Sequence, residues 1–132
     1  MRIHRWLGLS LFFVFLLSCA SITPRHADLG PKLTKLTKAV ESKVHYDPEC
    51  ASKMTERQLL YYAIAHDPEL LEPFKNMKVR ILQQNKHAIL LICTKDGSIA
   101  FFEDAGCTPE LDWTWNEKDP SRPCEFSLNV CE

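Results

Sequence analysis

The first eighteen residues constrain the fold most strongly, because they form an export signal and not part of a folded domain. Arg2 and Arg5 place positive charge at the start, and residues 7–17 are apolar apart from two small residues. A basic start followed by an apolar run is typical of a secretory signal peptide. The run is too short for a membrane-spanning helix, which needs about 20 residues. Removing residues 1–18 leaves 114 of the 132 residues, enough for one small domain at most.

A second motif lies at the end of this signal. The sequence Leu16-Leu17-Ser18-Cys19 resembles the lipobox of bacterial lipoproteins. That resemblance implies cleavage before Cys19, lipidation of Cys19 with acyl chains such as palmitate, and a stable membrane anchor. Ala20, and not Asp, follows Cys19, which in the enterobacterial sorting pattern implies the outer membrane, with the domain facing the periplasm. The alternative is cleavage after Ala20, which would release a soluble protein that begins at Ser21.

Residues 19–46 are expected to form the lipid anchor and a tether. Pro24 and Pro31 oppose one long helix across this segment. Apolar residues that would share one helical face follow Pro31: Leu33, Leu36, Val40 and Val44. They suggest either an amphipathic helix on the bilayer surface or a weakly structured, solvated tether. We favour the tether, because interspersed Thr and Ser residues lower helix propensity, so the domain is predicted to span residues 47–132.

Two short helices are predicted at the start of that domain. Thr55 and Gln58 have the spacing of a capping box, and apolar residues at helical spacing extend the helix over residues 56–66. Asp67 is placed to cap a second helix that ends near Asn76. Pro73 falls in its second turn, so this helix is predicted to be short or kinked.

An antiparallel meander is predicted to follow, with strands over residues 79–83, 88–93 and 98–102. The six consecutive apolar residues 88–93 are typical of a central strand buried on both faces. Asp96-Gly97 indicates a hairpin turn that places Cys93 opposite Ala100 and on the same face as Phe102. Residues 124–131 alternate and suggest a fourth strand. The predicted fold class is α+β: two short helices, then a three- to four-stranded antiparallel meander with a disulfide-stapled C-terminal segment.

Five cysteines remain besides Cys19: Cys50, Cys93, Cys107, Cys124 and Cys131. Export places them in an oxidising compartment, where disulfides stabilise small domains. An odd number allows at most two bridges within one chain. Sequence separation suggests Cys124 with Cys131 and Cys93 with Cys107, leaving Cys50 over, although connectivity does not follow from sequence. No zinc-type spacing of cysteines or histidines occurs, so we predict no metal site and no cofactor.

Two pairs of adjacent titratable residues do not predict catalysis. His66-Asp67 has no accompanying nucleophile motif, and Asp67 is explained as a helix cap. Glu103 and Asp104 would point to opposite faces of a strand and so could not act on one substrate, and we expect them at a solvated strand end. The chain is therefore predicted not to be an enzyme.

The C-terminal region offers a candidate binding surface made by Trp113, Trp115, Glu110 and Asp112. Two tryptophans at alternate positions lie on one side of an extended chain. With neighbouring carboxylates they could stack on sugars or anchor a basic protein partner. They could equally cover the exposed face of a small sheet, which is the interpretation we favour.

These features predict a non-enzymatic envelope lipoprotein that binds another envelope protein, as an accessory or assembly component. The membrane is contacted through the lipid anchor, and no strongly basic domain supports nucleic-acid binding. Two alternatives stay open. One is a module that binds cell-wall glycan (peptidoglycan) through the tryptophans, and the other is an anchored or secreted inhibitor of a lysozyme-like enzyme.

Overall fold

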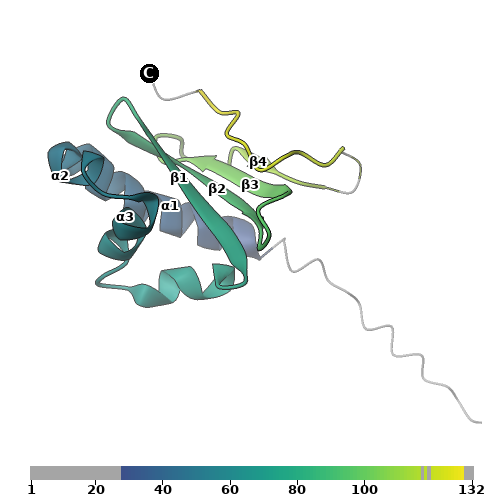
Figure 1. Cartoon of the computed structure of the whole chain (residues 1–132), viewed down its shortest axis with the longest axis horizontal. Helices are drawn as coiled ribbons and strands as arrows, with labels where there is room; N and C mark the ends of the chain where they lie inside the picture. Colours follow the sequence, from purple (N-terminus) through teal and green to yellow (C-terminus); the bar gives the residue numbers. More distant parts are fainter. Residues whose placement is uncertain (1–27, 117, 119, 130–132) are drawn as a thin grey trace, which may run out of the picture.

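Helices cover one face of a four-stranded antiparallel sheet, and the C-terminal segment crosses the other face (Figure 1). This computed structural model describes residues 28–116, 118 and 120–129. The predicted signal peptide (residues 1–18), Cys19 and Cys131 lie outside the described residues. The elements in chain order are α1 (Leu29–Tyr46), α2 (Pro48–Ser52), α3 (Glu56–Ala63), the 3-10 helix η1 (Pro68–Phe74), β1 (Met77–Gln84), β2 (His87–Thr94), β3 (Ala100–Ala105) and β4 (Trp113–Thr114). The α+β class predicted from the sequence is confirmed.

The predicted tether is wrong for α1, which is part of the core. Its apolar stripe is at most 1 % exposed at Leu33, Leu36, Val40 and Val44. The stripe faces the sheet and contributes to the same apolar cluster as Leu90 of β2, not to a membrane surface. Thr37, also buried, bonds its hydroxyl to the Leu33 carbonyl, so the helix accommodates it without an unsatisfied polar group. The domain therefore begins at α1, not at residue 47.

The two predicted helices exist, but both end earlier than the sequence suggests. The capping box of α3 is present: the Thr55 hydroxyl accepts the Gln58 N–H, and the Gln58 side chain accepts the Thr55 N–H. The second helix is a 3-10 helix that contains Pro73 and ends at Phe74, whose side chain is 1 % exposed. Because a proline inside a helix removes one backbone donor, the tighter and shorter form is favoured.

The sheet follows the predicted meander, with β2 as its buried centre. Every residue from Ala88 to Cys93 is buried, as the apolar run indicates. Asn85 and Lys86 connect β1 to β2 with positive φ angles of 52° and 63°, as a two-residue hairpin turn of the primed type requires. Alternate residues of β2 belong to different apolar clusters, so the two faces of the sheet have separate cores.

One irregularity in β3 overturns a predicted face assignment. Cys93 lies opposite Ala100 as expected, but Ile92 lies opposite Phe102, so Phe101 is the extra residue of a β-bulge. The bulge turns Phe102 to the α1 side, where it joins the large core, whereas Cys93 stays on the opposite side. The expectation that Phe102 and Cys93 share a face is wrong for this reason.

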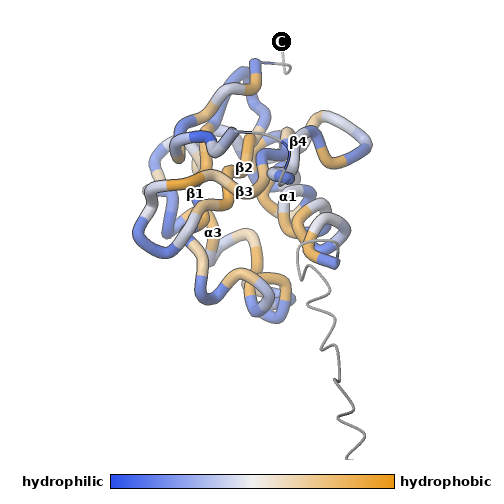
Figure 2. The backbone as a smooth tube through the Cα atoms, turned by 90° about the vertical axis from the view of Figure 1, so that its right-hand side faces the viewer, coloured by the Kyte–Doolittle hydropathy of each residue, from blue (hydrophilic) through white to orange (hydrophobic). Residues whose placement is uncertain are grey.

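The predicted fourth strand is also misplaced. The fourth strand is β4, which pairs with β3 through Trp113 and Thr114. Phe126 and Leu128, which we expected in that strand, instead pack on the sheet face that α1 does not cover, against Ile89 and Ala105. Figure 2 shows hydrophobic positions along the strands and along α1.

Candidate functional site

The C-terminal segment is fastened to the sheet by a disulfide that the sequence did not predict. Cys93 pairs with Cys124, with their Cα atoms 5.8 Å apart, so the expected pairings Cys93–Cys107 and Cys124–Cys131 are wrong. Cys93 lies near the start of β3, whereas Cys107 follows its far end, and the two are separated by the length of the strand. Cys107 is disulfide-bonded as well, and Cys50 is a free, half-buried thiol, which confirms it as the odd cysteine.

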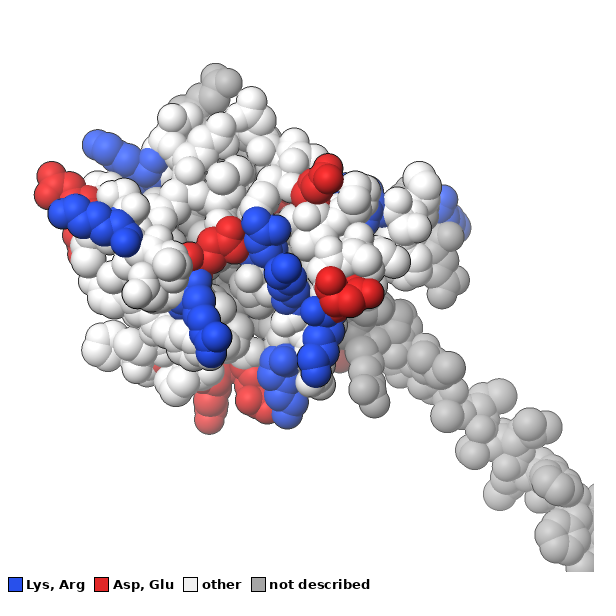
Figure 3. Space-filling model, viewed as in Figure 1, with Lys and Arg blue, Asp and Glu red and all other residues white. Residues whose placement is uncertain are grey.

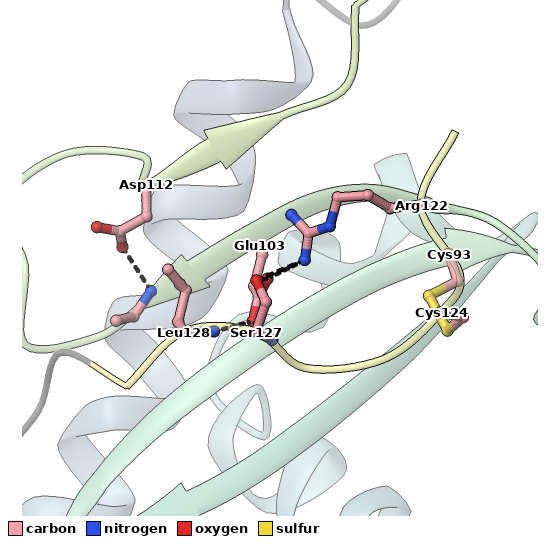
Figure 4. A network of polar contacts seen from close by, with 8 residues as sticks. Cys93, Glu103, Asp112, Arg122, Cys124, Ser127 and Leu128 are labelled. Atoms are coloured by element: carbon pink, nitrogen blue, oxygen red, sulfur yellow. Dashed lines mark hydrogen bonds and ion pairs between the residues drawn. A yellow bond between two sulfur atoms is a disulfide. The ribbon is translucent and has the colours of Figure 1, made fainter. Parts of the chain in front are cut away.

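A second fastening is made by the Glu103 carboxylate, which lies between Arg122 and the backbone of residues 127–128 (Figure 4). Glu103 is fully buried in the middle of β3. Its Oε1 accepts the N–H groups of Ser127 at 2.8 Å and Leu128 at 2.9 Å. Its Oε2 accepts the Arg122 guanidinium at 2.7 Å and the Ser127 hydroxyl at 2.8 Å.

These four donors determine the ionisation of Glu103. Burial by itself raises the pKa of this carboxyl, but the hydrogen bonds from Arg122, Leu128 and Ser127 outweigh burial and hold the pKa below its ordinary value. Glu103 is therefore a buried anion that connects β3 to the C-terminal segment. The expectation of a solvated strand end is wrong at this residue.

The candidate binding surface is largely occupied by internal contacts. The Arg122 guanidinium covers the ring of Trp113 at 3.9 Å, and Trp113 packs beside the Cys93–Cys124 disulfide. Trp115 meets Phe101 edge to face, with ring centroids 6.5 Å apart. Both tryptophans are half-buried, so the structure places them as cover for the sheet, the interpretation favoured from the sequence.

The two acidic residues of that surface have different surroundings. Asp112 accepts the Ala105 N–H at 2.8 Å and the Thr108 hydroxyl at 2.7 Å through Oδ2, and so fixes the loop that leaves β3. Glu110 is exposed. Both carboxylates are exposed, but Asp112 is tied to the loop by hydrogen bonds, so the acidic, tryptophan-bearing region is a folded part of the sheet edge.

Asp104 lies on the opposite face from Glu103, as predicted, but it is also buried, with 2 % exposure. Burial is the main cause that raises its pKa to about 6, and the nearby Asp112 carboxylate raises it further. Thr37 and Lys38 of α1 act in the other direction. A carboxyl with this pKa is protonated in mild acid and ionised at neutral pH.

This raised pKa predicts a pH-dependent stability that depends on Asp104. Between about pH 4 and pH 6 the folded state holds a proton that the unfolded state does not, so stability falls as the pH rises through this window. Two pKa units correspond to at most about 3 kcal/mol. Urea unfolding from pH 4.5 to 7.5 should show this fall in the wild type and a flatter profile in Asp104→Asn. The exposed control Asp67→Asn should keep the wild-type slope, and an unchanged slope in Asp104→Asn would contradict the prediction.

A groove of about 510 Å³ lies between α3, η1 and β1. Its floor is apolar and its rim carries four basic residues: Arg57, Lys75, Lys78 and Arg80. Figure 3 shows Lys and Arg side chains crossing the middle of this face, over β1. Arg80 pairs with Glu56 at 3.0 Å and Lys75 with Glu72 at 2.6 Å. Arg57 and Lys78 have no acidic partner among the described residues, so the groove carries excess positive charge.

Glu41, His45 and His87 form a further cluster of side chains, which was not predicted from the sequence. The possible metal-ligating atoms of these three residues all lie within 4.8 Å of one another. Glu41 and His45 are four residues apart on α1, a spacing that places both on one helical face and could have been noticed. His87 comes from the hairpin end of β2, and this long-range contact has no local signal.

Comparison with known protein families, with curated proteins and with solved structures gives no match to this chain. In the part of the chain that the structure describes, none of the helices combines the length and the hydropathy that crossing a bilayer requires.

Proposed function

We propose that this protein is a lipid-anchored envelope protein without catalytic activity, which binds an extended, acidic segment of another envelope protein along β1. The observation that carries the proposal is an outer edge of β1 without a neighbouring strand among the described residues, beside a groove with basic residues on its rim. An edge strand of this kind can accept a further strand through its backbone groups.

The backbone of β1 indicates which groups a partner would meet. The Ile81 N–H bonds to the Glu56 carboxylate, 3.4 Å away on α3, and so points away from β2. Since backbone groups alternate along a strand, Met77, Val79 and Gln83 face outward as well. Glu56 thus accepts the outward N–H of Ile81, and the outward backbone groups of Met77, Val79 and Gln83 can bond to a partner strand.

The positive charge on the rim of the groove favours an acidic partner. Arg57 and Lys78 lie on the rim of the groove without acidic partners among the described residues. A segment that carries Asp or Glu would complement them, and electrostatic attraction of this kind mainly increases the association rate and the specificity. This surface replaces the C-terminal one, because Arg122 covers a ring of Trp113 that a sugar or a partner side chain would need.

Site-specific photo-crosslinking in the living envelope tests this surface. A photoreactive residue at Lys78 should give a discrete adduct with one envelope protein, and the same residue at the exposed Lys118 should not. Adding Arg57→Glu should reduce the adduct at position 78 at least about fivefold, whereas Lys35→Glu on the exposed side of α1 should leave it unchanged. Equal crosslinking from positions 78 and 118 would contradict the proposal.

The anchor is tested separately, because the proposed location depends on Cys19. Intact mass spectrometry of protein extracted from membranes should show a chain that begins at Cys19 and carries acyl groups. Cys19→Ser should prevent that processing and leave Cys50, Cys93 and Cys124 unaffected. A mature chain that begins at Ser21 without lipid would instead identify a secreted protein.

A further inference from the structure

We propose that Glu41, His45 and His87 form a binding site for a divalent transition-metal ion of the zinc type. This site is independent of the β1 surface proposed above. The possible ligand atoms of the three side chains already lie within 4.8 Å of one another. Two imidazole nitrogens and one carboxylate oxygen make a ligand set that zinc accepts, with a fourth position left for water or for a ligand from a partner.

The fold brings the three residues together from two elements that pack on each other. Glu41 and His45 are one helical turn apart on α1. His87 is the first residue of β2, immediately after the turn at Asn85 and Lys86. The rings of His45 and His87 are stacked, with centroids 5.3 Å apart and an interplanar angle of 20°. Helix α1 and the β1–β2 hairpin thus each contribute one imidazole to the proposed site.

Only small movements separate this arrangement from a tetrahedral site. Metal–ligand bonds of about 2.0–2.1 Å place tetrahedral ligand atoms about 3.3 Å apart. Glu41 Oε1 and His87 Nδ1 are now 2.5 Å apart and would separate by about 1 Å. His45 is exposed, so its ring can turn toward the ion without disturbing the core.

The Glu41 carboxylate is held in place on its other side. Its Oε2 accepts the Ala88 N–H at 2.6 Å, which leaves Oε1 directed at His87. Gly106 packs against the same carboxylate so closely that a Cβ at this position would clash with Glu41. Outer contacts that orient a ligand in this way are typical of metal sites.

Lys38 of α1 does not compete for the carboxylate. Lys38 lies one turn before Glu41, but its amino group donates to the carbonyls of Gly106 at 2.5 Å and Thr108 at 2.7 Å. Glu41 therefore has His87 as its ion-pair partner among the described residues. A metal ion would take the place of that ion pair and connect all three side chains.

The ligand types determine which ion fits. Imidazole nitrogen with one carboxylate suits Zn²⁺, Ni²⁺ or Cu²⁺, whereas Ca²⁺ and Mg²⁺ require oxygen ligands throughout. We select Zn²⁺ as the probe because it accepts a distorted tetrahedron without redox chemistry. The alternative is that Glu41 and His87 form an internal ion pair only.

Isothermal titration of the tag-free, full-length mature protein with Zn²⁺ tests the site. A Cys50→Ser background removes the free thiol found among the described residues, which would otherwise be a strong zinc ligand. The expected result is one ion bound per chain. His45→Ala, at an exposed position, should weaken binding about tenfold or more, whereas the matched control His66→Ala, also exposed, should not.

Two results of the titration would overturn the site, and a third test is spectroscopic. One is the absence of stoichiometric binding by the Cys50→Ser protein at 100 μM zinc. The other is binding that His45→Ala weakens by less than tenfold, which would mean that the ion is bound elsewhere. X-ray absorption of the loaded protein should show nitrogen and oxygen ligands alone, and sulfur in the first coordination sphere would equally contradict the assignment.

Discussion

Deletion of residues 19–46, which the sequence assigns to a tether, is expected to leave the rest of the chain unfolded. Helix α1 provides the apolar cover for one face of the sheet. Four of its side chains are at most 1 % exposed: Leu33, Leu36, Val40 and Val44. Burial of an aliphatic side chain contributes roughly 2 kcal/mol. Four of them together contribute about 8 kcal/mol, which is comparable with the whole stability of a domain, about 5–15 kcal/mol.

Circular dichroism and urea unfolding of two truncated proteins measure this effect. The protein that begins at Asp47 should lose its cooperative transition, whereas one that begins at Asp28 keeps all of α1 and should retain it. Leu36→Ala in the longer protein should cost about 2–5 kcal/mol, and the exposed neighbour Lys35→Ala less than about 0.5 kcal/mol. A cooperative transition in the protein that begins at Asp47 would show that the sheet folds without α1.

The error at α1 has a specific physical cause. The apolar stripe predicts that one helical face is buried, but the same stripe suits a bilayer and a sheet. Thr34, Thr37 and Ser42 lower helix propensity by only about 0.5 kcal/mol each, much less than the burial of one leucine contributes. The cost of these three residues to helix formation is therefore real but smaller than the gain from burying the apolar stripe.

Local chemistry explains what could be predicted from the sequence. The Thr55 capping box, the turn at Asn85 and the hairpin at Gly97 depend on residues at most five positions apart, and all three are present. The bulge at Phe101 and the disulfide between Cys93 and Cys124 depend on how distant segments meet. No local pattern specifies either, so the predicted face of Phe102 and the predicted cysteine pairings were wrong.

The same distinction applies to the candidate sites. The sequence alone predicts an ordinary solvated carboxylate at Glu103, because the donors that keep it charged lie 19 to 25 residues further along the chain. The Glu41–His45 spacing is visible in the sequence, but His87 lies 46 residues from Glu41. Burial and pairing across such distances decide the chemistry of these residues, and only the folded chain defines them.

Replacing Glu103 with Ala is expected to destabilise the fold by about 3 kcal/mol, the lower end of the range for breaking a buried ion pair. The substitution leaves the N–H groups of Ser127 and Leu128 without their acceptor and removes the ion-pair partner of Arg122, whose guanidinium retains its bond to the Ser127 hydroxyl oxygen. The lower end applies because the Arg122 side chain is 25 % exposed and water can compensate part of the loss. The exposed control Glu125→Ala, on the same segment, should change the free energy of unfolding by less than about 0.5 kcal/mol.

Urea unfolding at several pH values distinguishes the contribution of this ion pair to stability from that of side-chain packing. Because the folded pKa of Glu103 lies below its ordinary value, its stabilisation is present above that ordinary value and is lost as the pH falls through the folded pKa. The deficit of Glu103→Ala should therefore shrink in acid. A deficit that stays constant with pH would assign the effect to packing alone.

Asp104 behaves in the opposite sense, since its folded pKa is raised to about 6. Above pH 6, Asp104→Asn should be more stable than the wild type and Glu103→Ala less stable, and both differences should diminish toward low pH. Adjacent residues on opposite faces of β3 thus give opposite results. Four donors surround the Glu103 carboxylate and lower its pKa, whereas burial raises the pKa of Asp104 and the Asp112 carboxylate raises it further.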